Sequence, residues 1–385
     1  MSTLFRRQAL AAQMTQQLLR PGPLDVGLRS GLFLSGLRRI GKTTFLLNDL
    51  IPSLADAGAL VIYVDLWTDT QANPATLVQN SIKQALKELE APASSLLSKL
   101  RRIKGLDVGA AGFKLGFNLD AIGTAQGATL EQVLVKLVDV AQTDVVLIID
   151  EVQQATTTED GHKLLIALKA ARDAVNLRPI TPGHFILIGT GSHRAKVNEL
   201  TVQRAQAFQG ATSIEYPVLD IAYIDFLLNA LRSAGISRVP SRDAAYAGFV
   251  KLGSRPEEMI KALRQVAALP DGADPDQFFP VIAATLRASA ADVELNKLER
   301  LGSLAAAIFD RVASAKTEVK GLYSADAIDA YAKAIGRPLA PEEIQPLINE
   351  LLNENLIMRS GHGRYSVTDP FVQQLWLEHK ALPPL

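Results

Sequence analysis

Short apolar runs alternate with segments of helical periodicity over the first 219 residues of the chain. The apolar runs cover residues 32–36, 59–67, 145–151, 184–192 and 211–218. Runs of this kind that end in turn residues are typical of strands buried in a parallel sheet. The segments of helical periodicity cover residues 42–57, 74–91, 130–142 and 160–178. Strands that alternate with helices predict an α/β fold with a doubly wound parallel sheet.

One segment of this region departs from the alternation of strands and helices. Within residues 105–123, Phe113, Leu115, Phe117 and Leu119 are separated by single small or polar residues, with glycines around them. A period of two predicts an inserted β-hairpin. An apolar flap that folds onto the core is the simpler interpretation, and an edge that binds a partner is the alternative.

The pattern becomes helical from about residue 220, and no further strand pattern occurs before residue 356. Helical segments fill residues 220–269, and the Pro-, Gly- and Asp-rich stretch at 269–276 predicts a hinge. Three helices and two short strands, joined by "GHG", then predict a winged-helix arrangement; they cover residues 301–314, 324–336, 341–354, 356–360 and 363–370. The expected domains are therefore a parallel-sheet domain at 1–219, with the N-terminal helix and the inserted hairpin, a helical lid at 220–290 and a winged helix at 291–385.

The N-terminal segment has apolar residues but no continuous apolar stretch. Its periodicity predicts an amphipathic helix rather than a signal peptide, with Leu4, Phe5, Met14, Leu18 and Leu19 on the apolar face. Nowhere do about twenty apolar residues follow one another, so we expect no membrane span and a cytoplasmic protein.

The composition excludes several kinds of site. Lys and Arg together number 40 and so do Asp and Glu, so no overall positive field indicates a nucleic-acid partner, although local basic patches remain allowed. The chain has no cysteine, which excludes disulfides, thiolate zinc sites and thiol catalysis. The histidines have no ligand-like spacing; they are His162, His184, His193, His362 and His379.

A glycine-bounded basic turn, "GLRRIGKTT", lies between the first strand and the first helix. Gly36, Gly41, Lys42 and Thr43 have the spacing of a P-loop, in which the two glycines let successive N–H groups point at a phosphate. The following helix start adds its positive dipole end. We expect Lys42 to reach the β- and γ-phosphates and the Thr43 hydroxyl to bind Mg²⁺. The predicted phosphate-binding residues are Gly36, Leu37, Arg38, Arg39, Ile40, Gly41, Lys42, Thr43 and Thr44.

The stretch "VVLIIDE" at 145–151 supplies acidic groups to the same site. Asp150 follows the buried strand at its carboxyl end, where ligands bind in such sheets, and is expected to orient the Mg²⁺ shell. Glu151 is placed to polarise an attacking water.

Two further positions are candidates with open alternatives. Thr190 or Ser192, after the strand "FILIGT", could hydrogen-bond the γ-phosphate or the water, or could cap a turn. Arg255, at a predicted helix start, could reach the γ-phosphate, or could be a solvated helix-terminal arginine.

These motifs together resemble the AAA+ superfamily of P-loop ATPases. More closely, they are similar to the archaeal-type and STAND-related ATPases with a C-terminal winged helix, a group that includes the origin-recognition ATPases. The resemblance covers residues from about 25 to 380. It rests on "GLRRIGKTTFLL", "VVLIIDE", "ILIGTGS", "GSRPEEM" and "GRYSVTDPFVQQLW".

The resemblance implies roles for residues at matching positions. Lys42 and Thr43 match the Walker A motif, and Asp150 and Glu151 match Walker B. Thr190 or Ser192 matches sensor 1, and Arg255 matches sensor 2. An arginine finger that completes a neighbouring subunit's site is expected after sensor 1, where Arg204 is the nearer candidate and Arg194 the other. The implied ligands are ATP and Mg²⁺.

Two classes of function follow from this resemblance. The first is an ATP-driven switch that couples nucleotide state to a protein effector or to a nucleotide-dependent homo-oligomer. The second is an ATPase that acts on DNA through the winged helix. The predicted recognition helix opposes the second, because its outer face carries Glu342, Glu343, Glu350 and Glu354, which phosphates repel. The wing, with Arg359, His362 and Arg364, is the better candidate contact for DNA.

Overall fold

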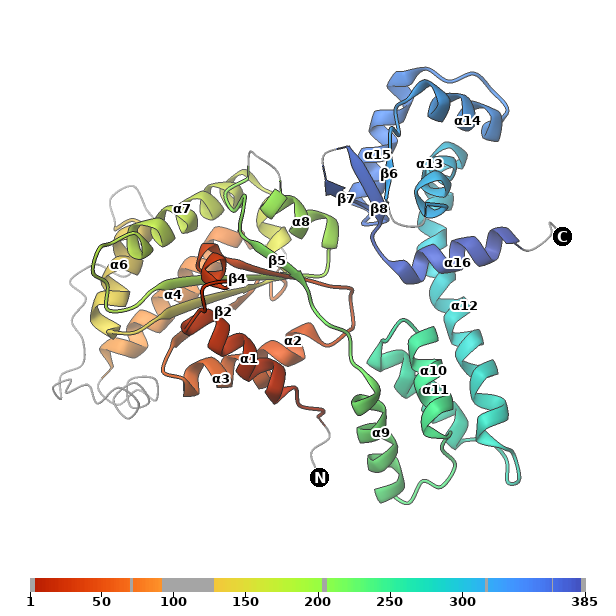
Figure 1. The fold of residues 1–385 in the computed structure, drawn as a ribbon, viewed down its shortest axis with the longest axis horizontal. Coiled ribbons are helices and arrows are strands. Elements are labelled where there is room, and N and C mark those ends of the chain that lie inside the picture. The colour runs from red at the N-terminus through yellow and green to blue at the C-terminus, as the bar shows by residue number, and fades with distance from the viewer. Residues whose placement is uncertain are drawn as a thin grey trace. The chain divides into compact units, whose positions relative to one another are not determined.

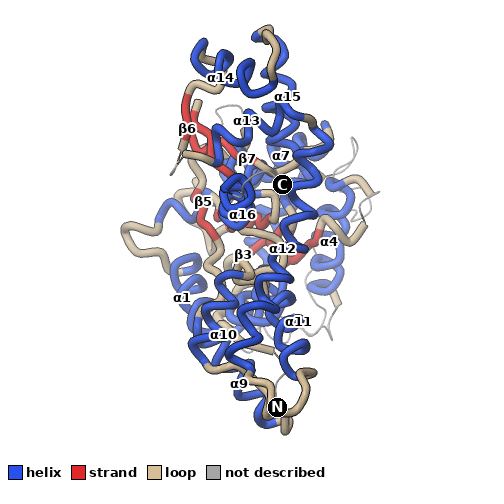
Figure 2. Tube along the Cα trace, turned by 90° about the vertical axis from the view of Figure 1, so that its right-hand side faces the viewer, coloured by secondary structure: helices blue, strands red, loops and turns tan. Residues whose placement is uncertain are grey.

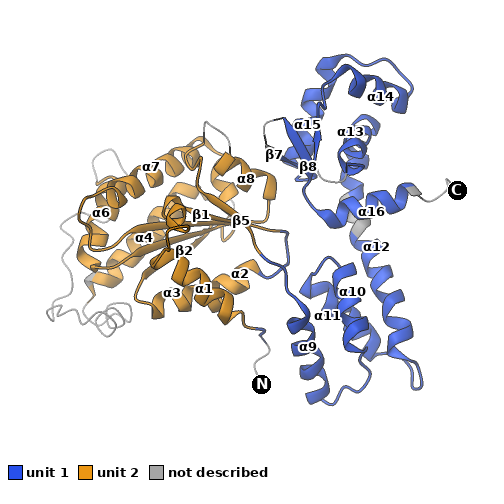
Figure 3. Cartoon of the chain, viewed as in Figure 1, with its two compact units in different colours: residues 1–5, 37–41, 217–385 blue, residues 6–36, 42–216 orange. Residues whose placement is uncertain are grey.

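The computed structural model describes residues 4–69, 72–91, 128–202, 206–315, 318–361 and 363–381. The chain divides into two compact units (Figure 3). Unit 2 consists of Arg6–Gly36 and Lys42–Tyr216, and unit 1 consists of Met1–Phe5, Leu37–Gly41 and Pro217–Leu385. The predicted hairpin near 105–123, Arg204 and His362 lie outside the described residues.

Unit 2 is built on a five-stranded parallel sheet. Its strands are β1 (Leu32–Ser35), β2 (Leu60–Asp65), β3 (Val145–Asp150), β4 (Phe185–Gly191) and β5 (Thr212–Glu215). Their order in the sheet is β2-β3-β4-β1-β5, so neighbouring strands are joined by crossovers. The predicted doubly wound parallel sheet is therefore confirmed.

Helices cover both faces of this sheet (Figure 1). One face carries α4 (Pro74–Glu90), α6 (Leu130–Ala141) and α7 (Glu159–Asn176), whose leucines and valines share one core with the strands. The other carries α1 (Gln8–Leu19), α2 (Lys42–Phe45) and α3 (Ile51–Asp56). The short α8 (Arg194–Val202), η1 (Val26–Ser30) and η4 (Val152–Thr156) were not predicted.

The first helix after β1 contains a π-helical turn, Leu46–Leu50, between α2 and α3. Pro52 explains this turn, because proline has no N–H for the carbonyl four residues earlier and its ring crowds that carbonyl. The carbonyl is that of Asn48, and the Arg6 guanidinium donates to it instead. Arg6 Nε also donates to Asp49 at 2.7 Å. An arginine before α1 thus completes the hydrogen bonds that a proline leaves open.

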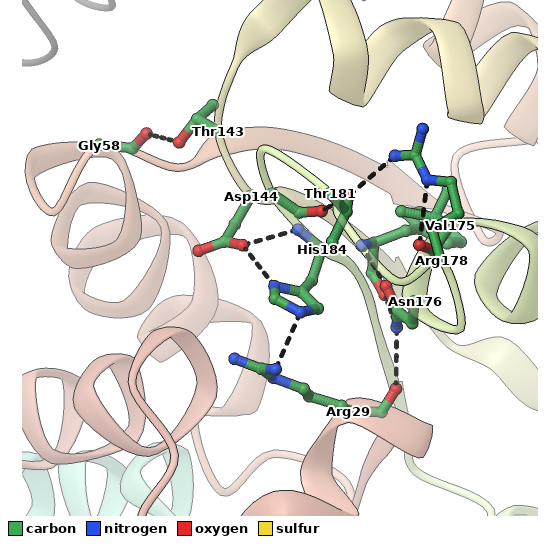
Figure 4. Close-up of polar contacts among 11 residues, drawn as sticks. Arg29, Gly58, Thr143, Asp144, Val175, Asn176, Arg178, Thr181 and His184 are labelled. Carbon is green, nitrogen blue, oxygen red and sulfur yellow. Dashed lines mark hydrogen bonds and ion pairs between the residues drawn. The ribbon is translucent and has the colours of Figure 1, made fainter.

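A polar cluster fixes the amino ends of β3 and β4 (Figure 4). Arg29 Nη1 lies 2.8 Å from His184 Nε2, and His184 Nδ1 lies 3.3 Å from Asp144. Because arginine can only donate, Nε2 of His184 accepts and Nδ1 carries the proton toward Asp144. Asp144 also accepts the backbone N–H of His184 at 2.8 Å. These contacts hold the register of the two strands whose opposite ends carry the candidate site.

Unit 1 begins with a helical segment that has its own core. It comprises α9 (Ile221–Ser233), α10 (Arg242–Lys251), α11 (Pro256–Ala267) and the long α12 (Pro275–Leu301). Tyr223, Phe249, Met259, Leu263 and Phe279 are buried together in this core. The predicted hinge at 269–276 contains the turn between α11 and α12, whereas the expected domain boundary at 290/291 falls inside α12.

The C-terminal part of unit 1 has a second core and a three-stranded antiparallel sheet of order β6-β8-β7. Figure 2 shows the strands β6 and β7 of this sheet near α13. Its elements are α13 (Ser303–Ala313), β6 (Val319–Lys320), α14 (Ala325–Ile335), η5 (Pro341–Glu343), α15 (Ile344–Asn353), β7 (Ile357–Gly361), β8 (Arg364–Val367) and α16 (Pro370–Ala381). The three helices and the hairpin lie where the sequence predicts them. The expectation of no strand before 356 was wrong, because β6 is too short to show alternation.

No helix in the described part of the chain is both long and apolar enough to cross a bilayer.

Candidate nucleotide-binding site

The candidate site lies at the carboxyl edge of the sheet in unit 2. Asp150 is the last residue of β3, and Thr190 lies on the adjacent β4. The residue before Asp150, Ile149, pairs with Gly189, which places Asp150 beside Thr190. Since β1 pairs with β4 on its other side, the chain that leaves β1 for α2 starts at this same edge.

Asp150 is the buried centre of a hydrogen-bond network. The Thr43 hydroxyl donates to its Oδ2 at 2.8 Å, and the Tyr63 hydroxyl donates to the same oxygen at 3.2 Å. Its Oδ1 accepts from the Thr190 hydroxyl and from the N–H of Glu151. Asp150 is 1% exposed and Thr190 is fully buried. The structure therefore brings together three residues that the sequence assigned separately to Walker A, Walker B and sensor 1.

Glu151 is held by a different set of donors. Its Oε2 accepts from the N–H of Ser192 at 3.1 Å, from the Ser192 hydroxyl at 2.8 Å, and from the side-chain amide of Gln153. The two sensor 1 candidates thus have different partners, since Thr190 binds Asp150 and Ser192 binds Glu151.

The loop from Gly36 to Thr44 has the curled backbone that the sequence predicts, with one difference. Positive φ occurs at Gly41 (89°) and at Arg39 (66°), whereas Gly36 is not among the described residues with positive φ. Lys42 is buried, and its ammonium donates to the Gly36 carbonyl at 2.7 Å. Thr43 and Thr44 are exposed at the helix start. The Lys42 side chain thus lies along the loop that is predicted to bind phosphate.

Arg39, with the rest of Leu37–Gly41, is grouped with unit 1. Its guanidinium lies 3.4 Å from Glu257 and 3.8 Å from Glu258, both in the first turn of α11. An arginine predicted to contact phosphate therefore forms ion pairs with two carboxylates in this structure.

Arg255, the sensor 2 candidate, precedes α11 and is not a solvated helix-terminal arginine. Its guanidinium forms an ion pair with Asp369 at 2.7 Å, and the two side chains are 15% and 13% exposed. The same guanidinium lies over the ring of Phe371, 4.7 Å from its centroid. Gly253 at φ +72° has Phe371 directly against it, because an added Cβ would lie 3.2 Å from the ring. Arg255 is thus attached to the segment that starts α16.

Of the two arginine-finger candidates, only Arg194 lies among the described residues. It is largely buried and forms an ion pair with Glu215 at 2.9 Å. To reach a neighbouring subunit, Arg194 would have to leave this ion pair. The role of Arg204 as the arginine finger stays a prediction.

The residues at this edge suit Mg²⁺ held together with phosphate. Thr43 and Asp150 offer hard oxygen donors, which Mg²⁺ prefers, and their oxygens lie 2.8 Å apart. Among the described residues, no cluster of three or more His, Cys, Asp or Glu could hold a metal on its own. Mg²⁺ at phosphate sites takes one or two protein ligands and completes its shell with water and phosphate oxygens.

Two residues of the site were missed by sequence reasoning, Tyr63 and Asp65 on β2. Asp65 pairs with Asp150 in register, at the same edge. Burial, and then the charges of Asp150 and Glu151, raise the pKa of Asp65. Burial, and then the charge of Asp150, raise the pKa of Tyr63 as well. The signal was available, because Asp65 ends a buried apolar strand just as Asp150 does. The edge gathers negative charge that a cation would neutralise.

Comparison with known proteins supports the fold. No protein-family model matches the chain, and no curated protein matches it in sequence. Among solved structures it is similar to a Walker-type ATPase of Pyrococcus abyssi, with a TM-score of 0.57, 17% identity and coverage of 97% of both chains. The ORC2 protein of Aeropyrum pernix in its ADP form has a TM-score of 0.48 and 12% identity, over 98% of this chain and 93% of that one. The chain thus shares the fold of this Walker-type ATPase, an α/β fold with a five-stranded parallel sheet.

Proposed function

We propose that this protein binds ATP with Mg²⁺, hydrolyses it, and uses the nucleotide state to change its interaction with a partner. The observation that carries the proposal is the network in which Thr43, Asp150 and Thr190 meet with Glu151 alongside. This network joins the end of the phosphate loop to the end of the strand that carries both acids. The shared fold with a Walker-type ATPase supports the same proposal at a coarser level.

Each residue has a role that follows from its chemistry. Lys42 exchanges the Gly36 carbonyl for phosphate oxygens, which bear a full negative charge. Thr43 and Asp150 would hold Mg²⁺, which would neutralise charge on the phosphates. Thr190 keeps Asp150 oriented by its hydrogen bond. Glu151 accepts the proton of the attacking water, and Ser192 keeps that carboxylate in place.

Phosphate release from ATP tests this proposal directly. We measure it with purified protein in Mg²⁺ and again after chelation by EDTA. Hydrolysis that requires Mg²⁺ supports the proposal, whereas no binding of ATP by calorimetry at any Mg²⁺ concentration overturns it.

We propose that Arg255 links the nucleotide to the C-terminal part of unit 1. The Asp369 carboxylate and the γ-phosphate are both anions that attract the Arg255 guanidinium, so a turn of this side chain toward the phosphate would weaken its ion pair with Asp369. ATP would therefore compete with Asp369 for Arg255, and the segment that starts α16 would be released when ATP is bound.

Asp369→Asn should raise the affinity for ATP on the order of 10-fold, because it removes the charge that competes for Arg255. The affinity for ADP, which lacks the γ-phosphate, should stay unchanged. Calorimetric titration of both nucleotides measures the difference. The matched control is Glu378→Gln, since Glu378 on α16 pairs with Arg287 on α12 at 3.0 Å and leaves Arg255 untouched. An equal change in the affinities for ATP and ADP would show that Arg255 does not contact the γ-phosphate.

We propose a protein partner rather than DNA for the C-terminal part. Ile344, Ile348 and Leu351 of α15 are buried, which leaves Glu350 on the exposed side of this helix. Glu342 and Glu354 at its two ends are exposed as well. These carboxylates would repel the phosphates of a duplex. Arg364 on β8 is paired with Glu318 at 3.2 Å, which further lowers the charge available to DNA.

Arg359→Ala and Arg364→Ala should therefore leave the affinity for a duplex DNA probe unchanged. Fluorescence anisotropy at two salt concentrations measures it. The paired changes Glu342→Lys and Glu350→Lys serve as the positive control, because removing repulsion should create salt-dependent binding. The DNA alternative instead requires each arginine change to weaken binding similarly across sequences, with a salt dependence flatter by about one phosphate contact.

A further inference from the structure

The two carboxylate oxygens of Glu151 have different surroundings. Oε2 accepts three hydrogen bonds, two from Ser192 and one from the Gln153 amide. Among the described residues, no hydrogen bond reaches Oε1. Three hydrogen bonds to one oxygen of a carboxylate fix the orientation of the whole group, and therefore the position of its second oxygen. Oε1 is therefore the oxygen able to accept a proton from water.

Gln153 contributes to this arrangement with an amide that is almost fully buried. Its side chain is 3% exposed, and its Oε1 has no hydrogen-bond partner among the described residues. A buried acceptor without a donor costs free energy that an apolar side chain of the same size would avoid. Rotating the amide by 180° would place its oxygen against the Glu151 carboxylate, so the donor orientation is the favourable one.

The backbone around Gln153 supports the same contact. Glu151 has φ 56°, in the left-handed region that residues other than glycine rarely adopt. The chain then turns through η4, which contains Gln153. Gly191, at the end of β4, gives the amide its space, because an added Cβ would lie 2.2 Å from Gln153 Oε1. The left-handed backbone at Glu151 and the absence of a side chain at Gly191 thus both allow Gln153 to reach Glu151.

We propose that Gln153 is a positioning residue for hydrolysis, which holds Oε2 of Glu151 so that Oε1 faces the attacking water. The proposal rests on the proposed role of Glu151 as the base. Gln153 touches neither nucleotide nor water in this role and acts through Glu151 alone. Its loss should therefore lower the rate of the chemical step and leave the binding of ATP intact.

The test compares Gln153→Met with the wild type in steady-state ATP hydrolysis. Methionine has a similar length and volume but no N–H. We expect kcat to fall about 10- to 100-fold, the effect of losing one hydrogen bond to a charged group, with KM and the affinity for ATP unchanged. Gln153→Glu, which places a like charge beside Glu151, should lower kcat at least as much and gives a second variant if the first fails to fold.

The neighbouring glutamine provides a matched control. No side-chain hydrogen bond of Gln154 occurs among the described residues, so Gln154→Met should keep wild-type kcat. Thermal unfolding of every variant separates loss of fold from loss of catalysis. In addition, Glu151→Gln with Gln153→Met should hydrolyse ATP no more slowly than Glu151→Gln alone, because Gln153 acts through Glu151.

Each result decides between the possibilities. A folded Gln153→Met variant with wild-type or higher kcat overturns the positioning role, and a rise in kcat would mean that these contacts withdraw Glu151 from the water. If Glu151→Gln keeps wild-type turnover, the assignment of the base is wrong and the role of Gln153 falls with it. If Glu151→Gln is slow while Gln153→Met is not, only the present inference fails.

Discussion

Lys42→Ala is expected to abolish nucleotide binding, with a loss of affinity for ATP of at least about 100-fold. The Lys42 ammonium is buried and lies 2.7 Å from the Gly36 carbonyl, a neutral acceptor inside the phosphate loop. Phosphate oxygens carry full charges and make stronger hydrogen bonds to an ammonium than a carbonyl does. Alanine leaves these phosphate charges without their point-charge partner in a partly buried position. Calorimetric titration with ATP and Mg²⁺ measures the loss.

Lysine at another position is the control for this change. Lys163 on α7 is exposed and pairs with Glu159 on its own helix at 2.8 Å, so Lys163→Ala should bind ATP like the wild type. The unfolding temperature of Lys42→Ala should remain close to that of the wild type, because the loop keeps its other backbone contacts. Retained affinity for ATP in a folded Lys42→Ala variant would refute the phosphate-loop interpretation.

Glu151→Gln is expected to lower turnover by roughly 10²-fold or more while ATP still binds. The glutamine oxygen can occupy the position of Oε2 and accept from Ser192 and Gln153, so the local structure is retained. Its amide group then takes the position of Oε1, where it can only donate and cannot accept a proton from water. The variant should consequently remain ATP-bound. Single-turnover phosphate release and the nucleotide content after desalting measure both effects.

Glu159→Gln is the matched control, because Glu159 lies in the exposed first turn of α7 and pairs only with Lys163 among the described residues. It should hydrolyse ATP at the wild-type rate. Unchanged turnover in Glu151→Gln would show that another group activates the water, and Asp65 at the adjacent strand end would be the next carboxylate to examine.

Those parts of the fold were predictable in which a helix or strand is long enough to show a hydrophobic pattern over several residues. The apolar runs that became β1, β3 and β4 are buried on both faces, and this is the property that makes such a run visible in a sequence. Shorter or more exposed elements gave no such signal. The two residues of β6 cannot show alternation, and α8 has a weakly amphipathic sequence that includes a buried arginine.

The candidate site was predictable where residues follow a motif along the chain and not where contacts come from folding. Lys42, Thr43, Asp150 and Glu151 were found from spacing and strand ends. The contacts of Gln153 with Glu151 depend on the left-handed backbone at Glu151 and on Gly191, which no local pattern indicates. The ion pair of Arg255 with Asp369 joins residues 114 positions apart. A single sequence gives the candidates for such pairs but not their partners.

The length of α12 has a mechanical consequence. This helix of 27 residues belongs to the core that it shares with α9, α10 and α11, at Phe279 and Ala283, and to the core of the C-terminal part of unit 1, at Leu298. At a rise of about 1.5 Å per residue it is about 40 Å long, and Pro280 near its first turns is a point at which it can bend. A tilt of about 10° at one end would sweep the other end through about 7 Å over that length. A side chain of α11 that changes partners would shift this neighbouring helix by about an ångström. The tilt of α12 would therefore turn that small shift into a displacement of its far end about as large as one helical turn.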